Sequence, residues 1–378
     1  MNSGKRARLL SMVVTVVGLS STHAHAAEQE ILVGHVAGYT GLVAKQAAEV
    51  AAGATVLFQS INERGGIDGR KLRLIAADDQ FNPELTVKLV GEMKGKAVAL
   101  LPMTGSANAL ALAKDNTLDL PLIGTLPSPE GVRNPVQKNI FHLRASDKEQ
   151  TEKILEQLLT VGLTNISILV PNSPAGEQAA KNVEAYLAGH DSKLLATGVY
   201  RLTGSKSDLQ PALSAVEGKP HRAVVLFGPS EHVADLVKEL RARGDTAPMY
   251  ALSYADSKSI VRAAGNGSAR GIVISQVLPN PNSKTLPLAR ALREDFAKYA
   301  KTKDEPTHLN FEGYIAARLI VEAIRKSKDP TAEGVRRGLE QLRAYDLGGY
   351  VVDFSPTRHQ GSSFVELAVI GSNGELVY

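Results

Sequence analysis

The chain is 378 residues long, 22% of them charged, and carries a formal net charge of +4 at pH 7 without any cysteine. That length is enough for two domains, each with its own hydrophobic core. The lack of cysteine excludes disulfides, thiol catalysis and thiolate metal sites. Basic residues form no cluster with interleaved aromatics, so the sequence indicates no nucleic-acid partner.

Residues 1–26 have the pattern of a secretory signal peptide. A basic start is followed by the apolar stretch 9–19 and by the small-residue cleavage pattern Ala24-His25-Ala26. We expect cleavage before Ala27, which removes three cations and leaves 40 Lys+Arg against 39 Asp+Glu. The apolar stretch is too short to span a membrane. There is also no cysteine for a lipid anchor. The sequence therefore predicts a periplasmic protein without stable membrane insertion.

The remaining chain alternates short apolar runs with amphipathic or alanine-rich segments, which is typical of alternating strands and helices. In a first block we expect strands at 31–36, 72–76, 98–101, 121–124 and 140–144, and helices at 43–64, 82–94 and 107–116. In a second block we expect strands at 166–170, 195–200, 223–227, 249–252 and 272–277, and helices at 147–161, 177–188, 208–216 and 231–243. Helices at 286–300 and 311–326, strands at 350–354 and 364–370, and a hairpin turn at Asn373-Gly374 follow. Two such blocks indicate an α/β protein with two lobes.

Two loops with hydroxyl side chains follow neighbouring strands of the first block. Thr104-Gly105-Ser106 comes after the strand at 98–101, and Ser106 is expected to cap the next helix. Thr125 and Ser128 come after the strand at 121–124. The carboxyl ends of parallel strands meet at one edge of a sheet, where open α/β sheets bind ligands and helix N-termini favour anions. On spacing alone, ordinary caps and turns are the favoured explanation of these residues.

The sequence contains no arrangement typical of catalysis. Dinucleotide, P-loop and nucleophile-elbow motifs are absent. Asp78 and Asp79 are adjacent in a strand and point to opposite faces, so we expect turn or cap roles. Glu312 and Asp353 have no obvious partners. His142 and His308 stand at element ends, where a solvated or hydrogen-bonded role is expected. We therefore predict neither an enzyme nor a metal or cofactor site.

Several motifs resemble those of the type I periplasmic solute-binding proteins of ABC transporters, the leucine/isoleucine/valine-binding-protein family. They are Ile61-Asn62-Glu63-Arg64-Gly65-Gly66-Ile67-Asp68-Gly69-Arg70-Lys71, Asp78-Asp79 with Pro83 behind, 141–146 and 310–314. The resemblance implies an α/β fold of two doubly wound lobes, with a ligand cleft between them and three hinge crossovers, near Ala145, Gln276 and Leu347. The N-terminal lobe would comprise 28–145 plus 276–346, and the C-terminal lobe 146–275 plus 347–378.

The resemblance also implies a ligand site. In the family, hydroxyls and amides of the first lobe bind a carboxylate, and the matching positions are Thr104, Gly105, Ser106, Thr125 and Ser128. The second lobe would contribute Ala175, Ser230, Ser253 and Tyr254. Here the chain departs from the family, which often has an aromatic residue at Ala175 and an acid at Ser253. The nearest acid is Asp256. We therefore expect a ligand with a carboxylate and no obligatory ammonium group, although Asp256 could serve one.

The function that this resemblance implies is an extracytoplasmic solute receptor of an ABC importer. It would bind a branched-chain or other amino acid, or a related organic acid, and deliver it to the permease subunits. A ligand-sensing module for a signalling receptor needs the same cleft and remains an alternative. An α/β enzyme is a third hypothesis, which would require a reactive constellation of side chains that the sequence does not contain.

Overall fold

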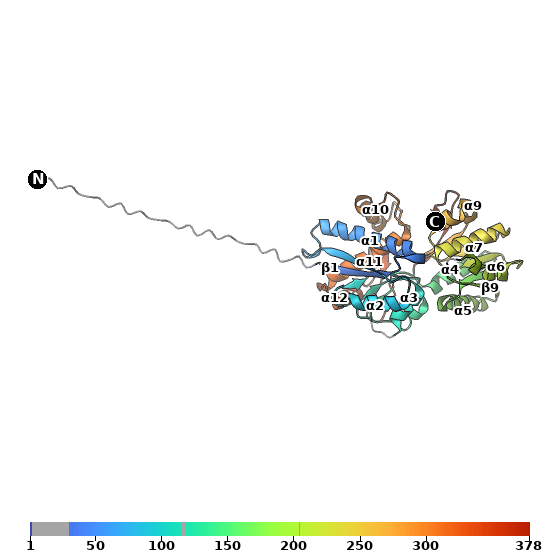
Figure 1. Ribbon diagram of the computed structural model, residues 1–378, viewed down its shortest axis with the longest axis horizontal. Helices are drawn as coiled ribbons and strands as arrows, with labels where there is room; N and C mark the ends of the chain where they lie inside the picture. The colour runs from blue at the N-terminus through green and yellow to red at the C-terminus, as the bar shows by residue number, and fades with distance from the viewer. Residues whose placement is uncertain (2–29, 115–117, 204) are drawn as a thin grey trace.

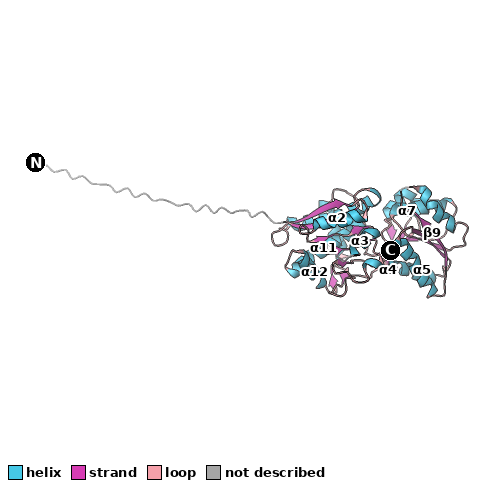
Figure 2. Cartoon of the chain, turned by 60° about the horizontal axis from the view of Figure 1, so that its bottom comes forward, coloured by secondary structure: helices cyan, strands magenta, loops and turns pink. Residues whose placement is uncertain are grey.

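The computed structural model describes residues 1, 30–114, 118–203 and 205–378. The signal peptide expected at 1–26 and the end of the helix expected at 107–116 therefore lie outside the described residues, Met1 apart. The described chain forms two lobes that lie side by side (Figure 1). Helices cover the strands in both lobes (Figure 2), so the α/β alternation expected from the sequence is confirmed.

The N-terminal lobe is built on a five-stranded parallel sheet of order β2-β1-β3-β5-β7. Its strands are β1 Ile31–Ala37, β2 Leu72–Asp78, β3 Ala99–Leu100, β5 Leu122–Ile123 and β7 Ile140–Phe141. The helices are α1 Ala44–Glu63 behind the 3-10 turn η1 Gly41–Val43, α2 Pro83–Met93, α3 Ser106–Ala113, α10 Pro287–Tyr299, α11 His308–Ser327 and α12 Ala332–Glu340. Successive residues of a strand face opposite ways. Ala99 and Leu101 therefore join the core under α1 and α11, whereas Leu100 joins the core under α2 and α3.

The C-terminal lobe is built on a seven-stranded sheet of order β16-β15-β12-β11-β10-β8-β9. The parallel strands are β8 Ile166–Pro171, β9 Leu194–Tyr200, β10 Ala223–Leu226, β11 Met249–Ala251 and β12 Val273–Gln276. Antiparallel strands β15 Glu366–Ile370 and β16 Leu376–Val377 extend one edge, and the turn expected at Asn373-Gly374 is confirmed. The helices are α4 Asp147–Thr160, α5 Pro174–Ala188, α6 Gln210–Val216 behind η3 Lys206–Leu209, α7 Ser230–Ala242, α8 Ser257–Ala264 and α9 Asn266–Ala269.

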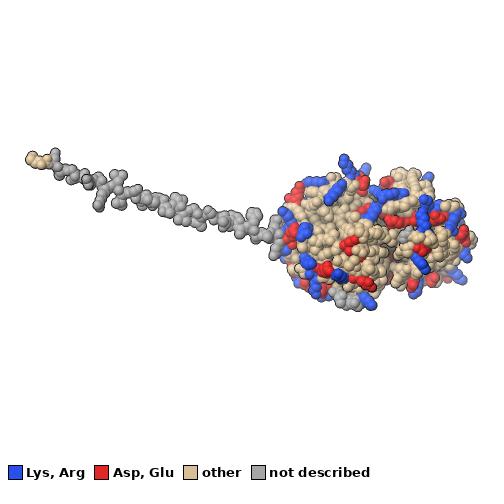
Figure 3. Space-filling view, viewed as in Figure 1, with Lys and Arg blue, Asp and Glu red and all other residues tan. Residues whose placement is uncertain are grey.

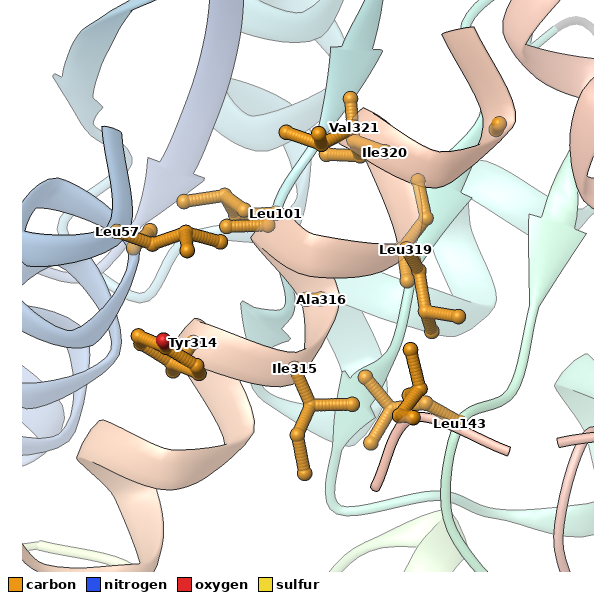
Figure 4. Packing of buried hydrophobic residues seen from close by; sticks show 14 of the residues in the cluster. Leu57, Leu101, Leu143, Tyr314, Ile315, Ala316, Leu319, Ile320 and Val321 are labelled. Carbon is orange, nitrogen blue, oxygen red and sulfur yellow. The ribbon is translucent and has the colours of Figure 1, made fainter. Parts of the chain in front are cut away.

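Helix α11 returns the chain to the N-terminal lobe and forms the centre of its core. Tyr314, Ile315 and Ile320 of α11 lie among Leu57, Leu101 and Leu143 (Figure 4). The backbones of α1 and α11 approach closely because glycine stands at the crossing. A Cβ atom on Gly53 would lie 1.8 Å from the Asn310 carbonyl oxygen. This close packing joins residues more than 250 positions apart into one rigid lobe.

The third passage of the chain between the lobes comes later than expected. The hairpin of β13 Tyr345–Asp346 and β14 Val351–Val352 packs, through Leu347 to Phe354, in the same core cluster as α1 and α11. Pairing with the second sheet resumes only at β15. We infer that the third crossover lies between Phe354 and Glu366 rather than near Leu347. The other two lobe boundaries remain those proposed from the sequence.

Three local expectations were wrong. Gly105, with φ 96°, is the N-cap of α3, and Ser106 is the first residue of the helix, without a capping bond. Glu312 is not isolated, because it pairs with Arg144. Asp353 pairs with Arg343 and Arg358. The partner of Glu312 is 168 residues away along the chain, which explains why no sequence pattern revealed it.

Candidate ligand-binding cleft

A cavity that opens to solvent lies between loops of the two lobes, and the empty space within it and its mouth is about 980 Å³. On the N-terminal side it is lined mainly by Val43, Gln46, Phe81, Gly105, Ser106, Leu126 and Pro127, and on the C-terminal side by Asp147, Pro171, Ala175, Gly176, Leu202, Phe227, Gly228, Pro229 and Tyr254. Most of these side chains are apolar, and the loops leave the carboxyl ends of their strands. This is the edge at which the sequence predicted ligand binding.

The N-terminal wall is fixed by a small parallel ladder and a polar network behind it. Strand β4 Met103–Thr104 pairs with β6 Thr125–Leu126, so the two hydroxyl loops run side by side. A side chain at Gly105 would lie 2.7 Å from the Asn108 side chain and 2.8 Å from the Phe81 ring. Asn108 in turn donates to Asp79 over 3.1 Å. Ser106 and the free amides of the first turn of α3 are thereby held at the cavity, where they suit an anion.

Three other first-lobe hydroxyls lie behind this wall. Thr104 Oγ1 accepts from the Gly38 N–H at 3.2 Å. Thr125 Oγ1 donates to Ser128 Oγ at 3.3 Å. Ser128 Oγ accepts from Arg133 Nη2 at 2.8 Å. None of the three hydroxyl-bearing residues lines the cavity, and all are fully buried.

Arg133 places a positive charge in the N-terminal wall. Its guanidinium is 4% exposed and has no carboxylate partner within the described part of the chain. Burial, only partly opposed by Glu149, Asp147 and Glu130, lowers its pKa to about 10, so the side chain stays charged at neutral pH. A cation behind Ser128 adds to the preference of this wall for an anionic group.

On the C-terminal side, Ala175 and Tyr254 line the cavity, whereas Ser230 and Ser253 do not. Ser230 Oγ accepts from the Asp256 N–H at 2.8 Å. Ser253 Oγ accepts a short hydrogen bond from Arg144, and the Ser253 N–H donates to Gln150 Oε1 at 3.0 Å. Of the nine residues predicted for the site, the structure therefore places Gly105, Ser106, Ala175 and Tyr254 at the cavity. The other five are engaged in bonds behind its walls.

Asp147 is a cavity residue that the sequence reasoning missed. Its Oδ1 accepts the Ser128 N–H at 3.0 Å, whereas no donor among the described residues reaches Oδ2. Burial raises the pKa of this carboxyl, and the Ser128 bond and the charges of Arg144 and Arg133 oppose that shift only in part. As the first residue of α4, Asp147 has the sequence signature of an ordinary acid at a helix N-terminus. Asp256, the acid considered from the sequence, pairs with Lys45 and does not line the cavity.

A buried ion pair lies where the first crossover meets both lobes. Arg144 Nη1 is 3.1 Å from Glu312 Oε2, and the two side chains are 1% and 3% exposed. Burial raises the pKa of Glu312, and Arg144 opposes the shift. Because Arg144 also binds Ser253, this pair joins α11 of one lobe to the loop after β11 of the other.

Other classes of site find little support among the described residues. Within 30–114, 118–203 and 205–378, no three His, Asp or Glu side chains are grouped to hold a metal ion. No helix in these ranges is long and apolar enough to cross a membrane. On the face shown in Figure 3, cationic and anionic side chains are interspersed over both lobes, so this face has no large region of one sign.

Comparison with known proteins gives consistent similarities. Residues 30–375 match the family model described as periplasmic binding protein. The structure is similar to that of an extracellular ligand-binding receptor from Verminephrobacter eiseniae ef01-2, with a TM-score of 0.87, 28% identity, and coverage of 93% of this chain and 100% of that chain. It is equally similar to a substrate-binding periplasmic protein from Ralstonia solanacearum, with a TM-score of 0.86, 31% identity, and coverage of 92% and 99%.

A curated relative is an amino acid binding protein from Pseudomonas aeruginosa, 24% identical over 251 residues, which are 64% of each chain. The chain spans less than two thirds of the length of the curated relatives that it matches. The two solved structures share the fold of this chain over 93% and 92% of its length.

Proposed function

Because the chain belongs to the periplasmic binding proteins, in the type I Leu/Ile/Val-binding family, we propose that it is an extracytoplasmic solute receptor of an ABC importer. It binds a small carboxylate-bearing ligand in the cleft and delivers it to the permease. The observation that carries the proposal is the composition of the cleft. Both lobes contribute, and its walls are mostly apolar. Besides Gln46, Glu130, Lys148, Thr151, Ser173, Gln178 and Asn182, its polar lining includes Ser106 at the start of α3 and Asp147 at the start of α4.

These polar groups suit the two ends of an amino acid. The ligand carboxylate accepts hydrogen bonds from Ser106 Oγ and from the first amides of α3, with Arg133 as a background charge. The ligand ammonium pairs with Oδ2 of Asp147, which accepts no hydrogen bond from the described residues. Phe81, Leu126 and Phe227 surround an apolar side chain.

This proposal revises the expectation from the sequence, in which an ammonium group was not obligatory and Asp256 was the acid that could serve one. With Asp147 in the cleft, an apolar amino acid becomes the preferred ligand over a simple organic acid. The name of the relative from Pseudomonas aeruginosa, an amino acid binding protein, supports the same choice.

A thermal-shift screen tests the ligand class. Apolar amino acids should be compared with the matching acids that lack the amino group and the matching amines that lack the carboxylate. A ligand that binds only the folded protein raises its melting temperature. We expect the largest shifts for the amino acids. A ligand without a carboxylate, or no shift with any of these compounds, would contradict the proposal.

Calorimetry then tests which residues bind the carboxylate and which bind the ammonium group of the ligand. Hydrogen bonds to a charged group contribute about 1.5–3 kcal/mol, so Ser106→Ala should weaken binding roughly tenfold to over a hundredfold. Asp147→Asn should weaken binding of the amino acid strongly and binding of the deaminated acid little. Ser372→Ala and Asp304→Asn alter exposed residues outside the cleft and serve as matched controls. Uptake of the same ligand should be lost in cells that lack the gene.

A further inference from the structure

The four-residue segment 253–256, between β11 and α8, contacts the other side of the cleft through most of its length. Ser253 binds Arg144 of the first crossover. The Tyr254 carbonyl accepts from Gln46 Nε2 at 3.1 Å. Asp256 Oδ2 accepts from Lys45 Nζ at 2.9 Å. Gln46 and Lys45 lie in the first turn of α1, so one short segment ties the C-terminal lobe to one helix end of the N-terminal lobe.

The ion pair between Lys45 and Asp256 is held firmly in place on the side of the C-terminal lobe. Asp256 is the N-cap of α8, where Oδ2 accepts from the Ser259 N–H at 2.8 Å, and its own N–H donates to Ser230 at the start of α7. Lys45 Nζ also donates to Ser259 Oγ at 2.6 Å. Two helices of one lobe therefore hold the acceptor in place, and Lys45 reaches it from the other lobe.

The electrostatics agree with a formed ion pair. Burial opposes the charged form of Lys45, yet Asp256 and Glu49 together raise the Lys45 pKa. Burial would raise the pKa of Asp256, and Lys45 and the Ser259 bonds lower it instead. The side chains are 34% and 13% exposed, so the pair can separate into water without stranding a charge in the protein interior.

The pair is adjacent to the cleft but is not part of its lining. Tyr254 and Gln46 line the cavity, whereas Lys45 and Asp256 do not. Each member of the ion pair is thus within two residues of a cavity residue, and Tyr254 and Gln46 are themselves hydrogen-bonded. A ligand that contacts Tyr254 and Gln46 favours the lobe arrangement in which Lys45 and Asp256 meet.

We propose that Lys45 and Asp256 form a latch between the lobes that stabilises the closed arrangement and so sets ligand affinity without contact with the ligand. The inference rests on the proposed function, because it requires a ligand in the cleft. If closure precedes or accompanies binding, the apparent dissociation constant rises as the closed fraction falls. Weakening the latch should therefore weaken binding and open the free protein.

The first test measures affinity by calorimetry with the amino acid that gives the largest thermal shift. The variants are Lys45→Met, Asp256→Asn and the double substitution. Asparagine keeps the capping ability at the start of α8 and removes only the charge. We expect each single variant to bind about two- to tenfold more weakly, and the double variant to bind no more weakly than either. Glu63→Gln is the matched control, because Glu63 lies at the other end of α1 and pairs with Lys298 of the same lobe.

The second test measures the lobe separation directly and needs no ligand. The chain has no cysteine, so the substitutions Lys88→Cys on α2 and Lys181→Cys on α5 allow two spin labels without background. Both positions are exposed. In the ligand-free protein, Lys45→Met should shift the distance distribution toward longer values, and Glu63→Gln should not.

The outcomes separate the two proposals. If wild type binds none of the amino acids, the proposed ligand class fails, and the distance measurement still decides the latch. If wild type binds an amino acid, while both latch variants keep its affinity and the distance distribution, the latch is refuted. Equal effects of Glu63→Gln and Asp256→Asn would also refute it, because the loss of affinity would then not depend on a bond between the lobes.

Discussion

Two charged pairs lie where the lobes meet, and they differ in their access to water. Arg144 and Glu312 meet at the first crossover with side chains 1% and 3% exposed. Lys45 and Asp256 meet beside the cleft with side chains 34% and 13% exposed. The two contacts have similar lengths, 3.1 Å and 2.9 Å, so their geometry does not distinguish them. What distinguishes the two pairs is the free-energy cost of separating their charges.

This difference assigns the two pairs to different tasks. If one partner of the buried pair is removed, the other charge remains in the interior without compensation, which is strongly destabilising. The pair beside the cleft can open because water replaces each partner. We infer that Arg144 and Glu312 keep the crossover fixed, and that Lys45 and Asp256 can break and re-form as the lobes move. The following substitutions test that distinction.

The largest effect should follow from Glu312→Gln. The substitution leaves the Arg144 guanidinium buried without a carboxylate, so we expect the free energy of unfolding to fall by about 3–5 kcal/mol. Urea denaturation of the ligand-free protein measures this loss. Glu84→Gln, which changes an exposed acid of α2, should stay within about 0.5 kcal/mol of wild type.

A double substitution sharpens the result. Arg144→Met with Glu312→Leu removes both charges and fills similar volume with apolar atoms, so it should recover much of the stability lost in Glu312→Gln. If Glu312→Gln were as stable as wild type, the pair would not have the role in the crossover that its burial implies.

A smaller effect is expected from Asp256→Asn. The capping bonds of α8 are retained and Lys45 turns toward water, so the free energy of unfolding should fall by about 1 kcal/mol or less. The same denaturation experiment compares it with Glu312→Gln. A loss as large as that of Glu312→Gln would mean that the pair beside the cleft is structural, and the contrast between the two pairs would disappear.

The two pairs also show what a sequence can and cannot reveal. Apolar runs such as 98–101 and 121–124 predict buried strands because composition and length are local properties, and they position β3 and β5 as expected. Glu312 and Arg144 are 168 positions apart, and Lys45 and Asp256 are 211 apart, so their pairing depends on how the lobes meet. Motif resemblance supplied the fold, but no local pattern indicates which acid faces a given base.

The predicted ligand site shows the same limit. Gly105 and Ser106 reach the cavity because the short ladder of β4 and β6 ends there. Ser128 has the same hydroxyl chemistry, yet Arg133, five residues on, binds it inside the wall. Asp147, by contrast, lines the cavity but was missed because its sequence context is an ordinary one. An acid in the first turn of a helix is common, and only the tertiary structure places Asp147 in the lining of the cleft.

The smallest effect concerns pH, and it follows from the direction of each pKa. The Asp256 pKa is lowered, so its contribution is present above pH 4 and is lost only as pH falls through the shifted value. The Lys45 pKa is raised, so its contribution is lost only in strong alkali. His308 near Asp256 has a pKa lowered to about 4 by burial and is neutral at pH 6 to 8. The ratio of dissociation constants between Lys45→Met and wild type should therefore change less than about twofold between pH 6 and 8.

Glu49 is the group that could disturb this flat profile. Burial, followed by the Asp256 charge, raises its pKa, and it lies 3.5 Å from Lys45. If the ratio does vary between pH 6 and 8, calorimetry on the Glu49→Gln background should remove the variation. A pH dependence of the ratio that persists there would contradict a latch formed by Lys45 and Asp256.

A pH dependence of affinity common to wild type and Lys45→Met has a different origin. It would point to Asp147, whose raised pKa makes affinity for an ammonium group increase with pH, and Asp147→Asn should abolish it.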